Sequence, residues 1–148
     1  MSTIRAAQEA ITSRLSGQAV FQGLTVMNRI KNDVVNDIEA EVQRIGMTIF
    51  VFPPTPGGAN ANLPGPQFSR MDFRIRVIEN PLLNQLSLDA YEAVEQVMRF
   101  VHDWDPKVTG IGRLFIHETP FEDNSAEEIV FDCLFRAQGQ FAPMNEPG

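Results

Sequence analysis

The feature that most constrains the fold is a long run of proline, glycine, asparagine and alanine between two strand-like segments, from Pro53 to Pro66. Proline removes a backbone donor and glycine is costly to order, so this run is expected to form neither a helix nor a long ladder. Loops of this length are uncommon inside a compact domain, and many of them reach a partner. We therefore predict that residues 53–68 form an arm used in binding or assembly. Its candidate contact residues are Pro54, Pro56, Asn60 and Asn62.

A strand is predicted on each side of this loop. Residues Met47 to Phe52 are mostly β-branched or aromatic, which is typical of a strand that buries both faces, and the proline pair ends it. Residues Ser69 to Ile78 alternate strictly between apolar and polar side chains, which predicts one buried face and one outer face. The apolar set is Met71, Phe73, Ile75 and Val77, and the polar set is Arg70, Asp72, Arg74 and Arg76.

Three helices are predicted from apolar positions spaced by three and four residues. The first covers Ser2 to Leu15, and the second covers Ile30 to Ile45 and stops at Gly46. The third is expected to start at an N-cap, Ser87, and to end near Trp104. Its predicted inner stripe is Leu88, Tyr91, Val94, Met98 and Val101. The stretch Gln18 to Met27 is too short and mixed to predict a regular element.

Two further strands are expected over Ile111 to Glu118 and Glu127 to Phe141, separated by a turn from Pro120 to Ser125. Residues 142–148 hold two prolines and are expected to be a loose tail. Because strands do not alternate regularly with helices, the order favours an α+β fold. We predict an antiparallel sheet of about four strands with helices packed on one face, in a single domain covering residues 1–148.

Composition narrows the functional classes. The chain has 148 residues, and 12 basic against 19 acidic residues give a net charge of −7, which argues against a non-specific binder of duplex DNA. The single cysteine, Cys133, excludes an intrachain disulfide and an intrachain thiolate metal cluster. Neither a signal-peptide core nor a stretch of about 20 apolar residues is present. We expect a soluble protein that is made and used inside a cell or released by lysis.

Catalytic motifs are absent from the sequence. It contains no nucleophile elbow, Walker loop, dinucleotide fingerprint or zinc-protease helix. His102 stands beside acidic residues at a predicted helix end, and His117 precedes Glu118 at a strand end, so both are interpreted as structural. Cys133 lies within an apolar strand and is interpreted as a small core residue. We therefore predict no enzyme activity, no metal and no cofactor.

The arginine stripe is the charge pattern that most needs an interpretation. Arg70, Arg74 and Arg76, with Asp72 among them, are expected on the outer face of the sheet. A solvated face with local Arg–Asp pairing is the ordinary interpretation, and a subunit interface is the sharper one. Direct nucleic-acid binding is the weakest of the three. Trp104, the single tryptophan, either caps the core or anchors an interface.

Several segments in succession carry a family resemblance. The alternating strand closes in Glu79-Asn80-Pro81-Leu82-Leu83-Asn84, and a helix with Ala90-Tyr91-Glu92-Ala93-Val94 leads to His102-Asp103-Trp104. Together with the N-terminal helix, the strand ending in proline and the variable loop, this order resembles the small tail-completion or tail-terminator proteins of tailed bacteriophages. The resemblance covers most of Ile30 to Phe141. The helix from Ile30 to Ile45 and the proline-rich loop depart from the usual pattern.

The resemblance implies a structural virion protein of the tail or neck, assembled in the host bacterial cytoplasm. Members form a ring, commonly of six subunits, that stops tube growth at the head-proximal end of the tail. The implied partners are further copies of the chain, the tail tube protein and a neck or connector protein, with the sheath protein as a further candidate. DNA is implied only as passing cargo, and no membrane is involved. The family has no catalytic residues.

Two other functional classes remain open from the residues themselves. One is a small-ligand or regulatory α+β domain in which the proline and glycine loop is a lid over a pocket. The other is a small enzyme whose site is not visible in sequence spacing. The lid hypothesis predicts a monomer or dimer, whereas the assembly hypothesis predicts a ring or a chain that oligomerises on a tail tube.

Overall fold

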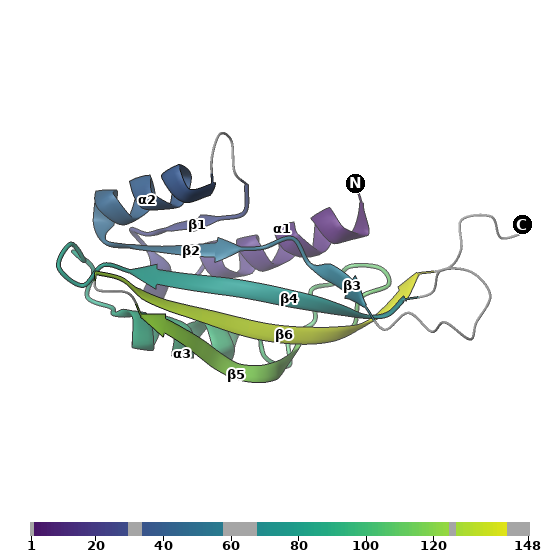
Figure 1. Cartoon of the computed structure of the whole chain (residues 1–148). Helices are drawn as coiled ribbons and strands as arrows, with labels where there is room; N and C mark the ends of the chain where they lie inside the picture. Colours follow the sequence, from purple (N-terminus) through teal and green to yellow (C-terminus); the bar gives the residue numbers. More distant parts are fainter. Residues whose placement is uncertain (1, 30–33, 58–67, 125–126, 142–148) are drawn as a thin grey trace, which may run out of the picture.

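A computed structural model of the chain describes residues 2–29, 34–57, 68–124 and 127–141 (Figure 1). Its helices are α1 (Thr3–Ser16), η1 (Ala19–Phe21, a 3-10 helix), α2 (Val34–Ile45) and α3 (Ala90–Val101). Its strands are β1 (Thr25–Met27), β2 (Met47–Val51), β3 (Thr55–Gly57), β4 (Phe68–Glu79), β5 (Phe115–Asn124) and β6 (Ile129–Phe141). No helix in these ranges is long and apolar enough to cross a membrane.

The strands form one sheet in the order β1-β2-β4-β6-β5, with β3 paired to β4 beyond the end of β2. All pairings are antiparallel except β1 with β2, which are parallel and are joined through α2. The predicted α+β class is therefore confirmed. The four expected strands are β2, β4, β5 and β6, and two strands of three residues each, β1 and β3, enlarge the sheet to six.

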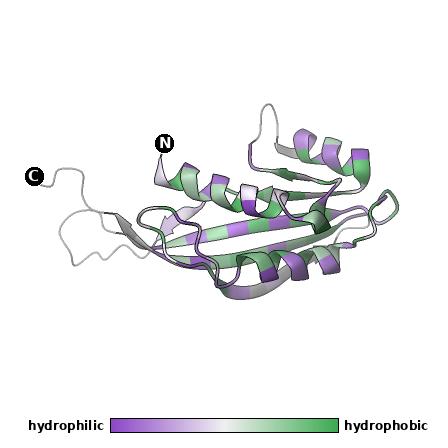
Figure 2. Ribbon diagram, turned by 180° about the vertical axis from the view of Figure 1, so that it is seen from behind, coloured by the Kyte–Doolittle hydropathy of each residue, from purple (hydrophilic) through white to green (hydrophobic). Residues whose placement is uncertain are grey.

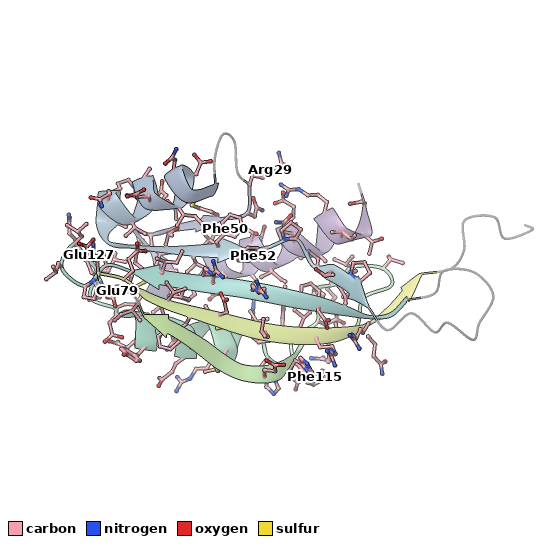
Figure 3. The ribbon with its side chains drawn as sticks, in the orientation of Figure 1. Arg29, Phe50, Phe52, Glu79, Phe115 and Glu127 are labelled. Carbon is pink, nitrogen blue, oxygen red and sulfur yellow. The ribbon has the colours of Figure 1, made fainter. Side chains whose placement is uncertain are left out.

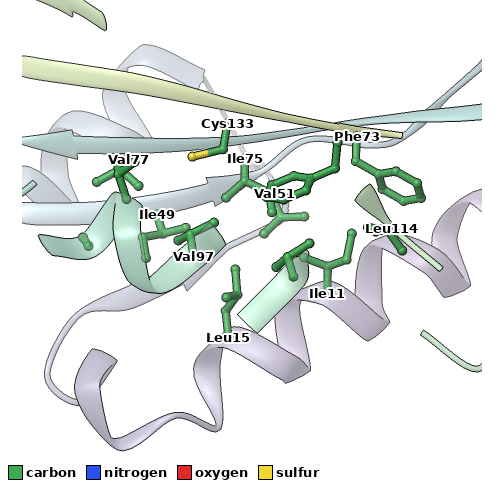
Figure 4. Close-up of a cluster of buried hydrophobic side chains, with 14 of the residues drawn as sticks. Ile11, Leu15, Ile49, Val51, Phe73, Ile75, Val77, Val97, Leu114 and Cys133 are labelled. Carbon is green, nitrogen blue, oxygen red and sulfur yellow. The ribbon is translucent and has the colours of Figure 1, made fainter. Parts of the chain in front are cut away.

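The main core lies between one face of the sheet and the helices α1 and α3. Both helices begin at a capping side chain. The Ser2 hydroxyl accepts the Arg5 N–H, and the Asp89 carboxylate accepts the Glu92 N–H. Seen from behind, α1 and α3 lie in front of the sheet (Figure 2). Their apolar side chains meet the inward residues of β2, β4 and β6 (Figure 4), and the labelled set is Ile11, Leu15, Ile49, Val51, Phe73, Ile75, Val77, Val97, Leu114 and Cys133.

The helix α2 is placed differently from the other two. Strand β2 is buried on both faces, as predicted, and its inward residue Ile49 belongs to the main core whereas Phe50 is 1% exposed but lies outside that cluster. Val42 of α2 is likewise buried outside the main core, and α2 packs on β2. The prediction that the helices pack on one face of the sheet is therefore correct for α1 and α3, whereas α2 covers the β1–β2 end of the opposite face. This difference arises because α2 is the crossover connection between the parallel strands β1 and β2.

Three details of the predicted third helix were wrong. Asp89, not Ser87, is the N-cap, because its Oδ1 accepts the Glu92 N–H at 2.8 Å. The helix ends at Val101, three residues before Trp104. Tyr91 was assigned to the inner stripe, but it is 52% exposed and packs its ring edge-to-face with Phe131.

Three predicted irregular segments contain regular structure. Residues of Gln18 to Met27 form η1 and β1, a parallel strand too short to show alternation. The first part of the proline-rich loop forms β3, in which Pro56 faces Met71; proline is accepted at a sheet edge because its missing N–H need not pair. The expected turn from Pro120 onward is part of β5, whose register shifts accommodate the proline. Asn60, Asn62 and residues 142–148 lie outside the described residues.

A single residue, Gly46, connects α2 to β2. Its φ of 93° is in the left-handed region, and its N–H donates to the Val42 carbonyl at 2.8 Å. Its own carbonyl accepts the Asn80 N–H at 2.9 Å. A Cβ at this position would lie 2.2 Å from Asn84 Cα. Glycine is therefore required here both by the backbone conformation and by the close approach of residues 80–85.

The same region holds a buried carboxylate. Glu79, at the end of β4, is 3% exposed, and its Oε1 accepts the Ala90 N–H at 3.1 Å. Its Oε2 accepts Asn84 Nδ2 at 2.5 Å, and this amide also donates to the Leu88 carbonyl at 2.8 Å. Glu79 therefore fixes the beginning of α3 against the end of β4 (Figure 3).

Candidate interface on the open sheet face

We use the term open face for the outer surface of β4 and β6, which no helix in the described residues covers. Outward residues there are half-buried or exposed, in contrast to their fully buried inward neighbours. The open face consists of Arg70, Asp72, Arg74, Arg76, Asp132, Leu134 and Arg136. The predicted alternation of β4 is thus confirmed: Met71, Phe73, Ile75 and Val77 are buried, and the arginine stripe points outward.

Strand register places opposite charges directly across from each other. Arg76 faces Asp132, and its Nε and Nη2 donate to the two carboxylate oxygens at 2.8 and 3.0 Å. Arg136 faces Asp72 and donates from Nε to Oδ1 at 2.8 Å. Cross-strand pairs of this kind stabilise a sheet and fix its register. The ordinary interpretation of the stripe, local Arg–Asp pairing, is therefore correct for these two pairs.

On the β2 side of the open face, two of the arginines contact an aromatic ring. The Arg74 and Arg76 guanidinium groups lie 5.6 and 5.2 Å from the centre of the Phe52 ring. Phe52 packs edge-to-face on Phe50 with ring centres 4.8 Å apart. Figure 3 shows Phe52 on the β2 side of this face and Phe115 on the β5 side. Arg74 is exposed and, among the described residues, no carboxylate lies within ion-pair distance of it.

The open face has an excess of positive charge. Four arginines share two aspartates, and Arg70 Nε lies 3.4 Å from Asp72 without forming a hydrogen bond. A cavity of about 430 Å³ opens where β4, β6 and the start of β5 meet, and four of its lining residues carry basic side chains. These are Arg70, Arg113, His117 and Arg136. A second cavity, of about 240 Å³, lies beside Phe52, Thr55, Arg74 and Leu134. Carboxylates are the groups that such a surface accepts.

The other residues predicted to make interface contacts are not part of the open face. Pro54 is buried, and Pro56 pairs within the sheet through β3. Trp104 is half-buried against the core, on the helix side, with Arg14 5.4 Å from its ring, which agrees with a hydrophobic cap. Sequence reasoning missed Asp132 and Arg136. The alternation of β6 was available as a signal, but the register that pairs them with β4 was not.

We predict that the Arg76–Asp132 pair contributes measurably to stability. Its side chains are only 31% and 14% exposed, so a double-mutant cycle with Arg76→Gln and Asp132→Asn is expected to give a coupling of about 1 to 2 kcal/mol. Chemical denaturation measures the four free energies of unfolding. The Arg113–Asp103 pair, at 56% and 63% exposure, is the matched control, and its coupling is expected to be near zero. Equal couplings at the two sites would contradict the prediction.

The two histidines differ in their surroundings. His102 follows α3, and its Nδ1 accepts the Ile116 N–H of the edge strand β5 at 3.0 Å. Its ring packs edge-to-face on Phe115. His117 Nε2 lies 3.7 Å from Glu118 at the surface. No group of three or more His, Cys, Asp or Glu side chains able to hold a metal occurs within the described ranges.

Cys133 is a core residue, as predicted. It is 1% exposed, and burial, assisted by the Asp132 charge, raises the pKa of its thiol from 9.0 to about 12. We expect a thiol reagent at pH 8 to modify Cys133 only as fast as the chain unfolds, and immediately in denaturant.

The free energy of unfolding is expected to fall between pH 9 and about 12, because the Cys133 thiol ionises at lower pH in the unfolded chain than in the folded one. Cys133→Ala should reduce this loss; an unchanged pH profile, or rapid labelling of the native chain, would contradict the prediction.

Comparison with known proteins supports the fold. No protein-family model and no curated protein matches the sequence. Among solved structures, a chain of the virion of a native gene transfer agent particle is similar, with a TM-score of 0.62 and 18% sequence identity over 90% of this chain and 94% of that chain. A second solved chain, whose name describes no function, gives a TM-score of 0.60 and 14% identity over 97% and 99%. The chain therefore shares its fold, over most of its length, with a chain of a gene transfer agent virion.

Proposed function

We propose that the chain is a structural component of a phage-like particle, and that it acts as a tail terminator. The observation that carries this proposal is the fold match to a chain of a gene transfer agent virion, which covers 90% of this chain and 94% of that one. A match over nine-tenths or more of both chains concerns most of each chain rather than a common motif. The order of elements and the segments around Glu79 to Asn84 and His102 to Trp104 point in the same direction.

In this proposal identical copies close into a ring, with six as the expected number, on the head-side end of the tail tube. A ring requires two different complementary patches on each subunit, and it closes when the rotation between neighbours fits. One face of the ring binds the tube, and the other meets the neck or connector protein, with sheath protein as a further candidate. Tube growth stops because the second face does not match a tube subunit. DNA passes through without specific readout, and no catalysis is involved.

The proposal is tested by the oligomeric state of the purified chain. Mass photometry over a range of concentrations is followed by negative-stain imaging with cognate tail tubes. We expect rings in solution, or density added to one end of each tube. A chain that stays monomeric and ignores the tubes would overturn the proposal and would favour the small-ligand domain with the loop as its lid.

The arm assigned to residues 53–68 is part of the proposal. Deleting residues 58–63 leaves the three residues of β3 and their pairing with β4 in place. Ring formation is expected to be lost while the circular dichroism spectrum and the thermal midpoint stay close to those of the full chain. A matched variant replaces the same residues with glycine and serine at constant length. If the deletion variant assembles normally, the segment has no role in assembly and is only a loop whose length the fold tolerates.

A further inference from the structure

Charge is segregated between the two sides of this molecule. The open face carries four arginines and two aspartates in a chain whose net charge is −7, so the rest of the surface is more acidic than the average. The clearest acidic surface is the outer side of α3. Asp89, Glu92 and Glu95 are exposed and follow each other at a spacing of three residues, which places them along one strip of the helix. We call these three residues the acidic strip.

The acidic strip and the open face point in opposite directions. The inner side of α3 packs on the inward residues of the sheet, through Ala93, Val94 and Val97. Its outer side is therefore one layer away from the sheet and faces away from it (Figures 1 and 2). Two complementary patches on opposite sides of one subunit generate a head-to-tail chain of copies, which closes into a ring when each copy is rotated relative to the last.

The other helices do not offer an equivalent partner surface. In α1 the acidic side chain Glu9 pairs with Arg5 and lies close to Arg29, and Arg14 is a second basic residue of the same helix. In α2 Glu41 pairs with Arg44, and the helix lies on the same side of the sheet as the open face. Among the described helices, α3 is the one that combines an acidic outer strip with a position opposite the arginines, and its single basic residue, Arg99, is exposed in the last turn.

The open face has unused capacity for carboxylates. Arg74 is exposed, and its guanidinium lies over Phe52 with no carboxylate partner among the described residues. The Arg70 side chain is 41% exposed, although its Nε is buried 3.4 Å from Asp72 and is not open to another chain. Both arginines border the cavities described above, of about 430 and 240 Å³. Arginine stacked on an aromatic ring is partly desolvated, which favours its pairing with a carboxylate brought by another chain.

We propose that the open face binds the acidic strip of a second copy of this chain, with Arg70 and Arg74 donating to the carboxylates of Asp89, Glu92 and Glu95. This inference rests on the proposed ring. It names both sides of the subunit contact: β4 and β6 of one copy, and α3 of the next. Because every copy contributes one patch of each kind to two different neighbours, all contacts in the ring are equivalent.

The test uses complementary charge reversals. The first variant is Arg74→Glu, which breaks no internal ion pair among the described residues. The second is Glu92→Lys with Glu95→Lys, and it leaves the N-cap Asp89 intact. Each variant alone is expected to raise the concentration needed for half-maximal ring assembly by roughly tenfold or more. Glu39→Lys, an equally exposed reversal on α2, is the control and should leave assembly unchanged.

Mixing the two variants gives the decisive result. In an equimolar mixture the reversed strip of one variant meets the reversed open face of the other, and the remaining contacts are native. We therefore expect rings of alternating variants at close to the native concentration, seen by native mass spectrometry. Rings that ignore both reversals, or a mixture that stays unassembled, overturn this inference and leave the proposed function standing. A native chain that never assembles, with or without tail tubes, overturns both.

Discussion

Replacing Gly46 with alanine is expected to lower the free energy of unfolding by about 3 kcal/mol. A side chain at a left-handed φ costs roughly 1 to 2 kcal/mol. The new Cβ would also meet the Asn84 backbone at 2.2 Å, and overpacking of this kind adds about 1 to 3 kcal/mol because backbone cannot move aside as a side-chain end can. Urea denaturation followed by circular dichroism measures the change.

Gly112→Ala is the matched control for this experiment. Its Cβ would have no neighbour closer than 3.6 Å, which is ordinary van der Waals contact. We expect its stability to stay within about 0.5 kcal/mol of the native chain. If both glycines tolerate alanine equally, the connection between α2 and β2 is not as tight as the distances around Gly46 indicate.

Glu79→Ala is expected to cost about 3 kcal/mol, since it leaves the buried Ala90 N–H without an acceptor and removes one of the two acceptors of Asn84 Nδ2, which keeps only the Leu88 carbonyl. Glu79→Gln should cost less, because its carbonyl oxygen still accepts one of the two hydrogen bonds. Hydrogen exchange should locate the damage, with faster exchange in the first turn of α3 than in α1. Uniform acceleration across both helices would show that the carboxylate does not act locally on α3.

Much of the fold could be predicted because its signals are local. The alternation of β4 gives both the buried face and the arginine stripe from ten consecutive residues, and the apolar period of α1 gives its bounds within one residue. The two short strands could not be predicted, because β1 and β3 are defined by their neighbours rather than by their own pattern. Pro56 in particular is a residue that normally argues against a strand.

The candidate interface likewise has a part that could be predicted from local sequence and a part that could not. The outward direction of Arg70, Arg74 and Arg76 follows from sequence, whereas their partners do not. Asp132 and Arg136 are more than 50 residues away along the chain, and only the β4–β6 register brings them opposite Arg76 and Asp72. The position of the acidic strip depends on which side of the sheet α3 packs, which is equally a property of the whole fold.

The edge strand β5 has a consequence for how copies of this chain behave when they are crowded together. An exposed strand normally invites another strand to add to it, and so allows sheets to grow from molecule to molecule. Here two register shifts interrupt the strand, and the His102 ring occupies the Ile116 N–H that an added strand would use. Copies made in excess are therefore expected not to add to one another through β5 at high concentration, as the strands of fibrils do, which leaves other faces free for ordered assembly.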